Sequence, residues 1–203
     1  MNRKWIRSSL LLAGAVALAT SASVAQPAVV NSTASASMGM SQATSGMTQA
    51  SPADRMFLRK AAQGNAAEIA MARLAVKKAE SPAVRKFAER LIYDHTMLGK
   101  KAGPVLQGAG VTPPSGPSLA QQQEMAALEA VSGNQFDDLF IKDAVADHIQ
   151  VLAMFCHEAA DGQDPQVKAF ASMGTPIIHS HLVMAKRLAR QMDLNTSGSV
   201  TTM

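Results

Sequence analysis

Helix start and stop signals divide residues 51–192 into segments whose apolar residues recur at helical spacing. Ser81-Pro82 and Asp164-Pro165 each combine a helix N-cap with a proline at the first helical position. Glycine- and proline-rich stretches end or interrupt the helices. Strand-like alternation of β-branched residues is nearly absent. The sequence therefore predicts an all-α fold in which helices bury their apolar faces against one another.

Four long helices and one short helix are expected. They cover about residues 51–80, 82–108, 119–131, 135–160 and 165–192. The short helix follows a Pro-rich connection, GVTPPSGPS. This connection and the short helix together are long enough to cross a bundle from end to end. The second helix and the long helix after the crossover would then run parallel, as in ferritin-like folds with one crossover.

An internal repeat indicates two similar hairpins. SPAVRKFA at 81–88 resembles DPQVKAFA at 164–171 at an offset of 83, whereas Phe57 aligns with Phe136 at an offset of 79. The difference of four residues is about one helical turn. The predicted fold is a ferritin-like four-helix bundle of two duplicated helical hairpins, with a Pro-rich crossover that contains one short extra helix.

The two ends of the chain differ from the bundle. Basic MNRKWIR, apolar SSLLLAGAVALAT and small SASVAQP have the order of a secretory signal peptide, with cleavage expected after Ala25. Uncharged residues 26–50 are expected to form a flexible linker, and residues 193–203 a disordered tail. No later apolar run reaches the roughly 20 residues of a membrane helix. We therefore expect an exported soluble protein of the periplasm or cell envelope, or a secreted one.

Charge and cysteine usage narrow the partners. Arg3, Lys4 and Arg7 leave with the signal, so 16 of the 19 basic residues remain against 15 acidic ones. Without clustered positive charge, nucleic acid is not an expected partner. Cys156 is the only cysteine, so no intramolecular disulfide forms, and we expect it to pack as a small hydrophobe. The sequence identifies no protein or small-molecule partner.

Acids and histidines interrupt the apolar faces of the four long helices. LIYDHTML and VADHIQVL each place an aspartate beside a histidine in an apolar run. A rise of about 1.5 Å per residue puts the candidates at one level of the bundle. These candidates are Glu68, Asp94, His95, Asp147, His148 and His181. His157 and His179 fall off the main stripes and are expected at the surface.

Two interpretations of this layer remain open. In the first, the acids pair with the histidines in a structural hydrogen-bonded layer that fixes helix register, and the protein is a non-enzymatic envelope protein with a binding or stress-related role. In the second, the protein binds a transition metal ion, with or without redox activity. Its ligands would be Glu68, His95, His148 and His181, with Asp94 and Asp147 as further ligands or as orienting partners.

Several segments resemble a known family. FLRKAAQGNAAEIAMARLA, VRKFAERLIYDHT, LEAVSGNQFDDLFI, VADHIQVLAMF and HSHLVMAKRLA are similar to an exported bacterial family of ferritin-like bundles, catalogued as a domain of unknown function and often labelled outer-membrane or secreted. The resemblance covers about residues 53–190 and implies a bundle and an envelope location, but no activity. Ferritin-like di-iron proteins place Glu three residues before His on two helices. Ile92 and Ile178 stand there in this chain, so a standard di-iron centre is not expected.

Overall fold

The computed structural model describes residues 49–198, with side chains described as far as Asp193. The described part of the chain is helical and has no strand, which confirms the predicted all-α class. Its helices are α1 (Pro52–Lys78), α2 (Pro82–Gly108), α3 (Leu119–Ala130), α4 (Gly133–Asp161) and α5 (Pro165–Gly198). Within residues 49–198, no helix has both the length and the apolar character needed to cross a membrane.

The helix bounds agree with the capping signals at most ends. Ser51 and Ser118 both form capping boxes, and proline opens α1, α2 and α5. α5 continues to Gly198, into the segment expected as a tail. The expected signal peptide and nearly all of the expected linker lie outside the described residues.

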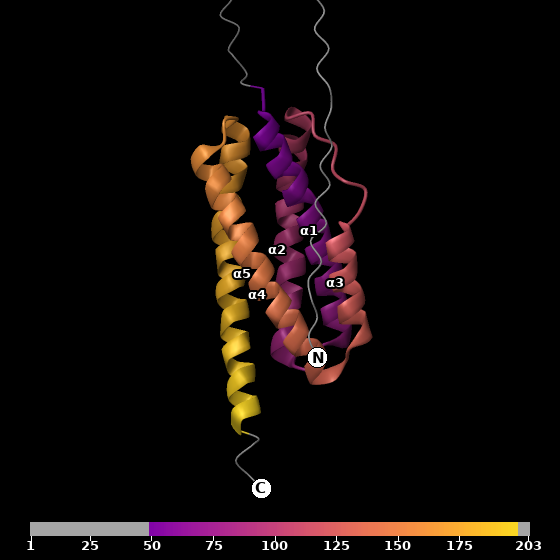
Figure 1. The fold of residues 1–203 in the computed structure, drawn as a ribbon. Coiled ribbons are helices and arrows are strands. Elements are labelled where there is room, and N and C mark those ends of the chain that lie inside the picture. Colours follow the sequence, from indigo (N-terminus) through magenta and orange to yellow (C-terminus); the bar gives the residue numbers. More distant parts are fainter. Residues whose placement is uncertain (1–48, 199–203) are drawn as a thin grey trace, which may run out of the picture. The chain divides into compact units, whose positions relative to one another are not determined.

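The long helices pack as two hairpins, α1 with α2 and α4 with α5 (Figure 1). α2 also packs against α5, and α1 against α4. α3 makes few contacts, chiefly with α1 and α4. Figure 1 shows that the Pro-rich connection and α3 return the chain to the opposite end of the bundle, so that α2 and α4 run in the same direction. Side chains from all four long helices therefore meet in one core.

Asp54 ties the start of α1 to the turn between α4 and α5. Its buried carboxylate closes the capping box with Ser51 and accepts the backbone amides of Gln163 and Asp164 at 2.9 and 3.2 Å. Burial by itself would raise the pKa of Asp54, but hydrogen bonds from Gln163, Ser51 and the Glu158 side chain lower it to about 2. Burial and the hydrogen bond to Asp54 raise the pKa of Glu158 to about 7.

Asp137 makes the matching contact at the other hairpin. It is buried near the start of α4 and accepts the amides of Glu80 and Ser81, in the turn between α1 and α2, at 3.2 and 2.7 Å. Both sets of contacts are related by the 83-residue offset of the sequence repeat. This offset aligns Phe57 with Phe140. The sequence repeat alone had aligned Phe57 with Phe136, at an offset of 79 for the first helix of each hairpin. A slip of about one helical turn leaves an apolar stripe in phase, so the stripe alone does not fix the alignment.

Two apolar clusters fill the bundle, and a polar layer lies between them. On α2, Leu91 belongs to one cluster and Leu98 to the other, and buried His95 lies between them. His148 on α4 and His181 on α5 also lie between residues of the two clusters, in the reverse order along α5. The histidines are therefore enclosed above and below by close-packed apolar side chains.

Cys156 corrects one expectation. Its side chain is exposed on α4 instead of packed in the core. The neighbouring Phe155 takes the inward position, and the next residue along a helix turns about 100° away from it. His157 and His179 are exposed, as expected.

Gly174 provides room for the Phe155 ring. A Cβ at position 174 would lie 2.4 Å from the Phe155 Cε1 atom. Phe155 packs against Phe57 and Phe170, with ring centroids 4.9 and 5.9 Å away. A side chain on Gly174 would therefore displace the aromatic cluster that borders the polar layer.

We expect Gly174→Ala to lower the free energy of unfolding by about 1–3 kcal/mol, because overpacking forces the Phe155 ring from its position. Urea titration measures the effect. Gly103→Ala is the matched control, since a Cβ there meets no atom within 4 Å. The control should be neutral or stabilising by up to about 1 kcal/mol. Equal effects of the two substitutions would contradict the close packing of Gly174.

The Glu158 carboxyl predicts a pH dependence of stability. Its pKa rises from 4.5 to about 7 on folding. Between pH 4.5 and about 7 the folded state therefore keeps a proton that the unfolded state has lost. Stability should therefore fall as pH rises from about 5 to about 8. Glu158→Gln should flatten this decline, because an amide donates to Asp54 at every pH. Thermal unfolding at each pH measures it, with exposed Glu129→Gln as control. A decline of equal slope in Glu158→Gln would exclude Glu158 as its source.

Candidate functional site

Three buried histidines from three helices meet in the polar layer. His95 of α2, His148 of α4 and His181 of α5 are 4, 2 and 0 % exposed. Their ring centroids lie 5.2–6.1 Å apart. Each ring offers a nitrogen within 4.8 Å of a nitrogen on each of the others. The three side chains therefore form one compact cluster.

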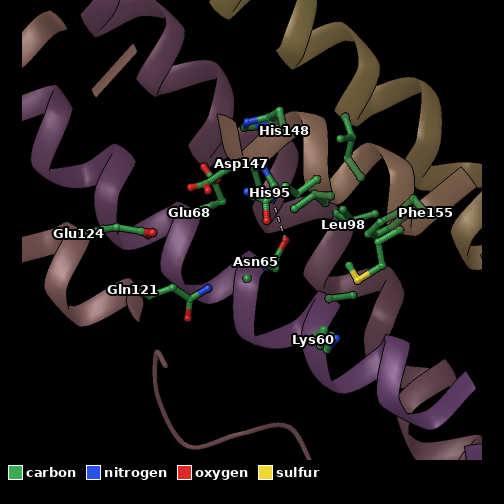
Figure 2. Close-up of a pocket in the computed structure, with 16 residues that line it drawn as sticks. Lys60, Asn65, Glu68, His95, Leu98, Gln121, Glu124, Asp147, His148 and Phe155 are labelled. Atoms are coloured by element: carbon green, nitrogen blue, oxygen red, sulfur yellow. Dashed lines mark hydrogen bonds between the residues drawn. The ribbon is translucent and has the colours of Figure 1, made fainter. Parts of the chain in front are cut away.

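Asn65 of α1 holds the first ring. The Nδ1–H of His95 donates to the Asn65 Oδ1 atom at 3.1 Å (Figure 2). Gly99, one turn after His95 on α2, leaves space for this amide, since a Cβ there would lie 3.0 Å from the Asn65 Nδ2 atom. All four long helices thus contribute to the layer.

Asp94 of α2 holds the ring of His181. The His181 Nε2–H donates to the Asp94 Oδ2 atom at 2.8 Å, and the same oxygen accepts from the Arg90 guanidinium. Burial would raise the pKa of Asp94, but the hydrogen bonds from Arg90 and His181 lower it. Burial lowers the pKa of His181 against the opposing effect of Asp94. The pair therefore consists of an ionised carboxylate and a neutral imidazole.

The ring of His148 is held by its own helix. Its Nδ1–H donates to the Ala144 carbonyl oxygen at 2.8 Å. One nitrogen of each of the three rings is thus fixed as a donor. The other nitrogens, His95 Nε2, His148 Nε2 and His181 Nδ1, are buried and have no hydrogen-bond partner. Each ring therefore carries a free lone pair at a defined position.

The electrostatics keep the rings neutral. Burial, followed by the neighbouring rings of His181 and His148, lowers the pKa of His95 to about 3. Burial and the proximity of His181 lower the pKa of His148 to about 4. At neutral pH the nitrogens without hydrogen-bond partners are therefore unprotonated, which is the form that coordinates a metal ion.

A pocket of about 390 Å³ borders His95 and His148. Figure 2 shows the carboxyl groups of Glu68 and Asp147 close together in it, with Glu124 directed towards them from α3. Burial, then the charges of Asp147 and Glu124, raise the pKa of Glu68 to about 8. Burial, followed by the charges of Glu124 and Asp143, raises the pKa of Asp147 to about 6. Among the described residues, neither carboxylate hydrogen-bonds a histidine.

The structure sorts the six candidates into two groups. His95, His148 and His181 come together, and Asp94 orients one of them. Glu68 and Asp147 lie in the adjoining pocket instead of the histidine cluster. Sequence reasoning missed Asn65 and the Ala144 carbonyl. The signal for Asn65 was an amide in the small apolar run AAQGNAAEIA, one turn before Glu68.

The fold and the layer define a helical bundle with a core three-histidine cluster. The chain belongs to the family described as "Domain of unknown function (DUF4142)", which matches residues 39–188. It is also similar in fold to the crystal structure of a DUF305 fragment from Deinococcus radiodurans, with a TM-score of 0.61 and 19% identity over 70% of this chain and 98% of that one. No curated protein matches the sequence.

We expect His148→Leu to raise the free energy of unfolding by roughly 1 kcal/mol in chelator-treated protein. The change removes a buried nitrogen without a partner, and such a group costs about 1–3 kcal/mol. The Ala144 carbonyl keeps its helical hydrogen bond. Exposed His179→Leu is the control and should change little. A loss of stability in His148→Leu would indicate that the layer is a satisfied structural network.

Proposed function

We propose that this chain is an exported protein that binds one divalent transition-metal ion on His95, His148 and His181. The observation that carries the proposal is a cluster of three buried histidines whose ligand nitrogens lie within 4.8 Å of one another, each ring having one nitrogen without a hydrogen-bond partner. One metal ion would provide a partner for all three lone pairs at once.

A purely structural polar layer explains the geometry less well. In such a layer each buried polar atom has a hydrogen-bond partner, since leaving one unpaired costs about 1–3 kcal/mol. Of the acid–histidine pairs expected from the sequence, only Asp94 with His181 forms. Three neighbouring rings that each leave one nitrogen without a partner contribute little to helix register, and they are a suitable donor set for a metal.

The donor set indicates the class of metal. Neutral imidazoles suit zinc, copper, nickel and iron, and among divalent ions nitrogen ligands bind copper most strongly. Metal–nitrogen distances of about 2.0–2.1 Å place ligand nitrogens roughly 3.3 Å apart in a tetrahedral site. The ligand nitrogens lie within 4.8 Å of one another in the structure, and modest movements of the rings would bring them to this separation. We therefore propose Zn(II) or Cu(II), with three protein ligands and one further coordination position.

The groups behind the rings support the same function. Asn65, Asp94 and the Ala144 carbonyl each accept the N–H opposite the free lone pair. Partners of this kind fix the tautomer and orientation of histidine ligands. Glu68, expected from the sequence as a ligand, lies in the bordering pocket and is not required for the three-nitrogen site.

The proposal includes export and a duplicated, ferritin-like origin of the bundle. The basic, apolar and small segments of residues 1–25 support export to the periplasm or cell envelope. The reciprocal contacts of Asp54 and Asp137, related by 83 residues, support duplication of one hairpin. The parallel course of α2 and α4 supports the ferritin-like arrangement. The metal site differs from a di-iron centre, because Ile92 and Ile178 replace its glutamates.

The direct test uses residues 26–203 isolated from the periplasm without a metal-binding tag. We expect about one equivalent of Zn(II) or Cu(II) by mass spectrometry, either as isolated or after reconstitution. His148→Ala should weaken binding at least 100-fold, since it removes one of three ligands. His179→Ala is the matched control, because it removes an exposed histidine and should bind as the parent chain does.

Two results would contradict the proposal. One is the absence of stoichiometric metal after reconstitution with zinc, copper, nickel and iron. The other is equal metal loss in the His148 and His179 variants, which would place the ion at the surface. Circular dichroism of His148→Ala separates loss of the site from loss of the fold.

A further inference from the structure

We propose that the acidic pocket between α1, α3 and α4 is the route by which the metal ion reaches and leaves the three histidines, so that the bound ion exchanges with solvent. This inference rests on the proposed function and adds how the site is loaded. It predicts an exchangeable ion instead of a permanently enclosed structural one.

The pocket adjoins two of the three ligands. His95 and His148 line it, and the Nε2 atom of each is buried without a hydrogen-bond partner. His181 is fully buried and does not line the pocket. Along the bundle axis the layer is covered by the two apolar clusters. The pocket therefore leads from solvent to the cluster past Glu68 and Asp147, which line the same wall.

The wall of this route carries acids from three helices. Glu124 of α3 interacts electrostatically with Glu68 of α1 and with Asp143 and Asp147 of α4. Lys60 is the one basic residue among those that line the pocket. A cleft lined by one sign of charge concentrates counter-ions and raises their association rate by about 10–1000-fold. This wall favours the approach of a divalent cation.

Glu124 and Asp147 act by their charge and not as a second coordination site, whereas Glu68, with its pKa raised to about 8 by burial, is protonated at neutral pH. Among the described residues, the cluster close enough to hold an ion consists of His95, His148 and His181. In Figure 2 Glu68 and Asp147 lie close together, and Glu124 is directed towards them from α3. Glu124 and Asp147 fit the guidance of an ion towards the unpartnered nitrogens.

Glu124 is the best residue for a test. It is half-buried on α3, which makes few contacts with the bundle and is fixed near its end by hydrogen bonds from the Lys78 Nζ atom to the carbonyls of Leu128 and Glu129. Glu124→Gln removes the charge, keeps a strong helix former and leaves the three histidines in place. Glu129→Gln makes the same change on the exposed side of α3.

The experiment measures the association rate of Zn(II) with metal-free residues 26–203 by stopped-flow mixing with a fluorescent zinc chelator. We expect Glu124→Gln to lower the association rate about three- to tenfold and to make its decrease with added salt shallower. Asp143→Asn should act in the same direction. Glu129→Gln should associate at the parent rate.

The outcomes separate this inference from the proposed function. If the parent chain binds no stoichiometric zinc or copper, the proposed function fails and this inference fails with it. If the parent chain binds zinc but Glu124→Gln and Asp143→Asn keep its association rate, the route is wrong and the three-histidine site stands. A faster dissociation with an unchanged association rate would make Glu124 a ligand and would also overturn the route.

Discussion

A buried nitrogen that lacks a hydrogen-bond partner costs free energy, and in this bundle three neighbouring histidine rings each carry one. The arrangement is specific because the opposite nitrogen of each ring is already held by Asn65, Asp94 or the Ala144 carbonyl. These partners prevent the rings from turning to satisfy one another. The layer therefore leaves three ring nitrogens without partners, and the metal ion that we propose would supply one partner for all three.

The rest of the fold positions this layer. The carboxylates of Asp54 and Asp137 each bind the turn of the opposite hairpin, which fixes how the hairpins slide along one another. A slip of one helical turn would move a histidine by about 5.4 Å and separate the ring nitrogens. The apolar clusters cover the layer at both ends along the bundle axis, and burial keeps the imidazoles neutral. The turn contacts at the two ends of the bundle and the geometry of the histidine layer in its middle therefore depend on the same alignment of the hairpins.

The helices and the histidine layer were predictable because both depend on local patterns. Caps and prolines set the helix starts, and the helical period placed His95, His148 and His181 on inward faces. The role of Glu68 was not predictable, because one turn along α1 decides whether Asn65 or Glu68 meets the cluster, and that depends on how the hairpins register. The Ala144 carbonyl carries no side-chain signal at all. Cys156 shows the same limit, since an apolar helical run does not tell which neighbour faces the core.

We propose that three neutral imidazoles, each with a fixed tautomer, offer their free lone pairs to one metal ion. Long-range proton–nitrogen NMR of the histidine side chains in metal-free protein at neutral pH tests it most directly. The account predicts fixed tautomers, with the proton on Nδ1 of His95 and His148 and on Nε2 of His181, and a shift of the three opposite nitrogens on addition of one equivalent of Zn(II). Protonated rings, averaged tautomers, or zinc-induced shifts at the hydrogen-bonded nitrogens would contradict it.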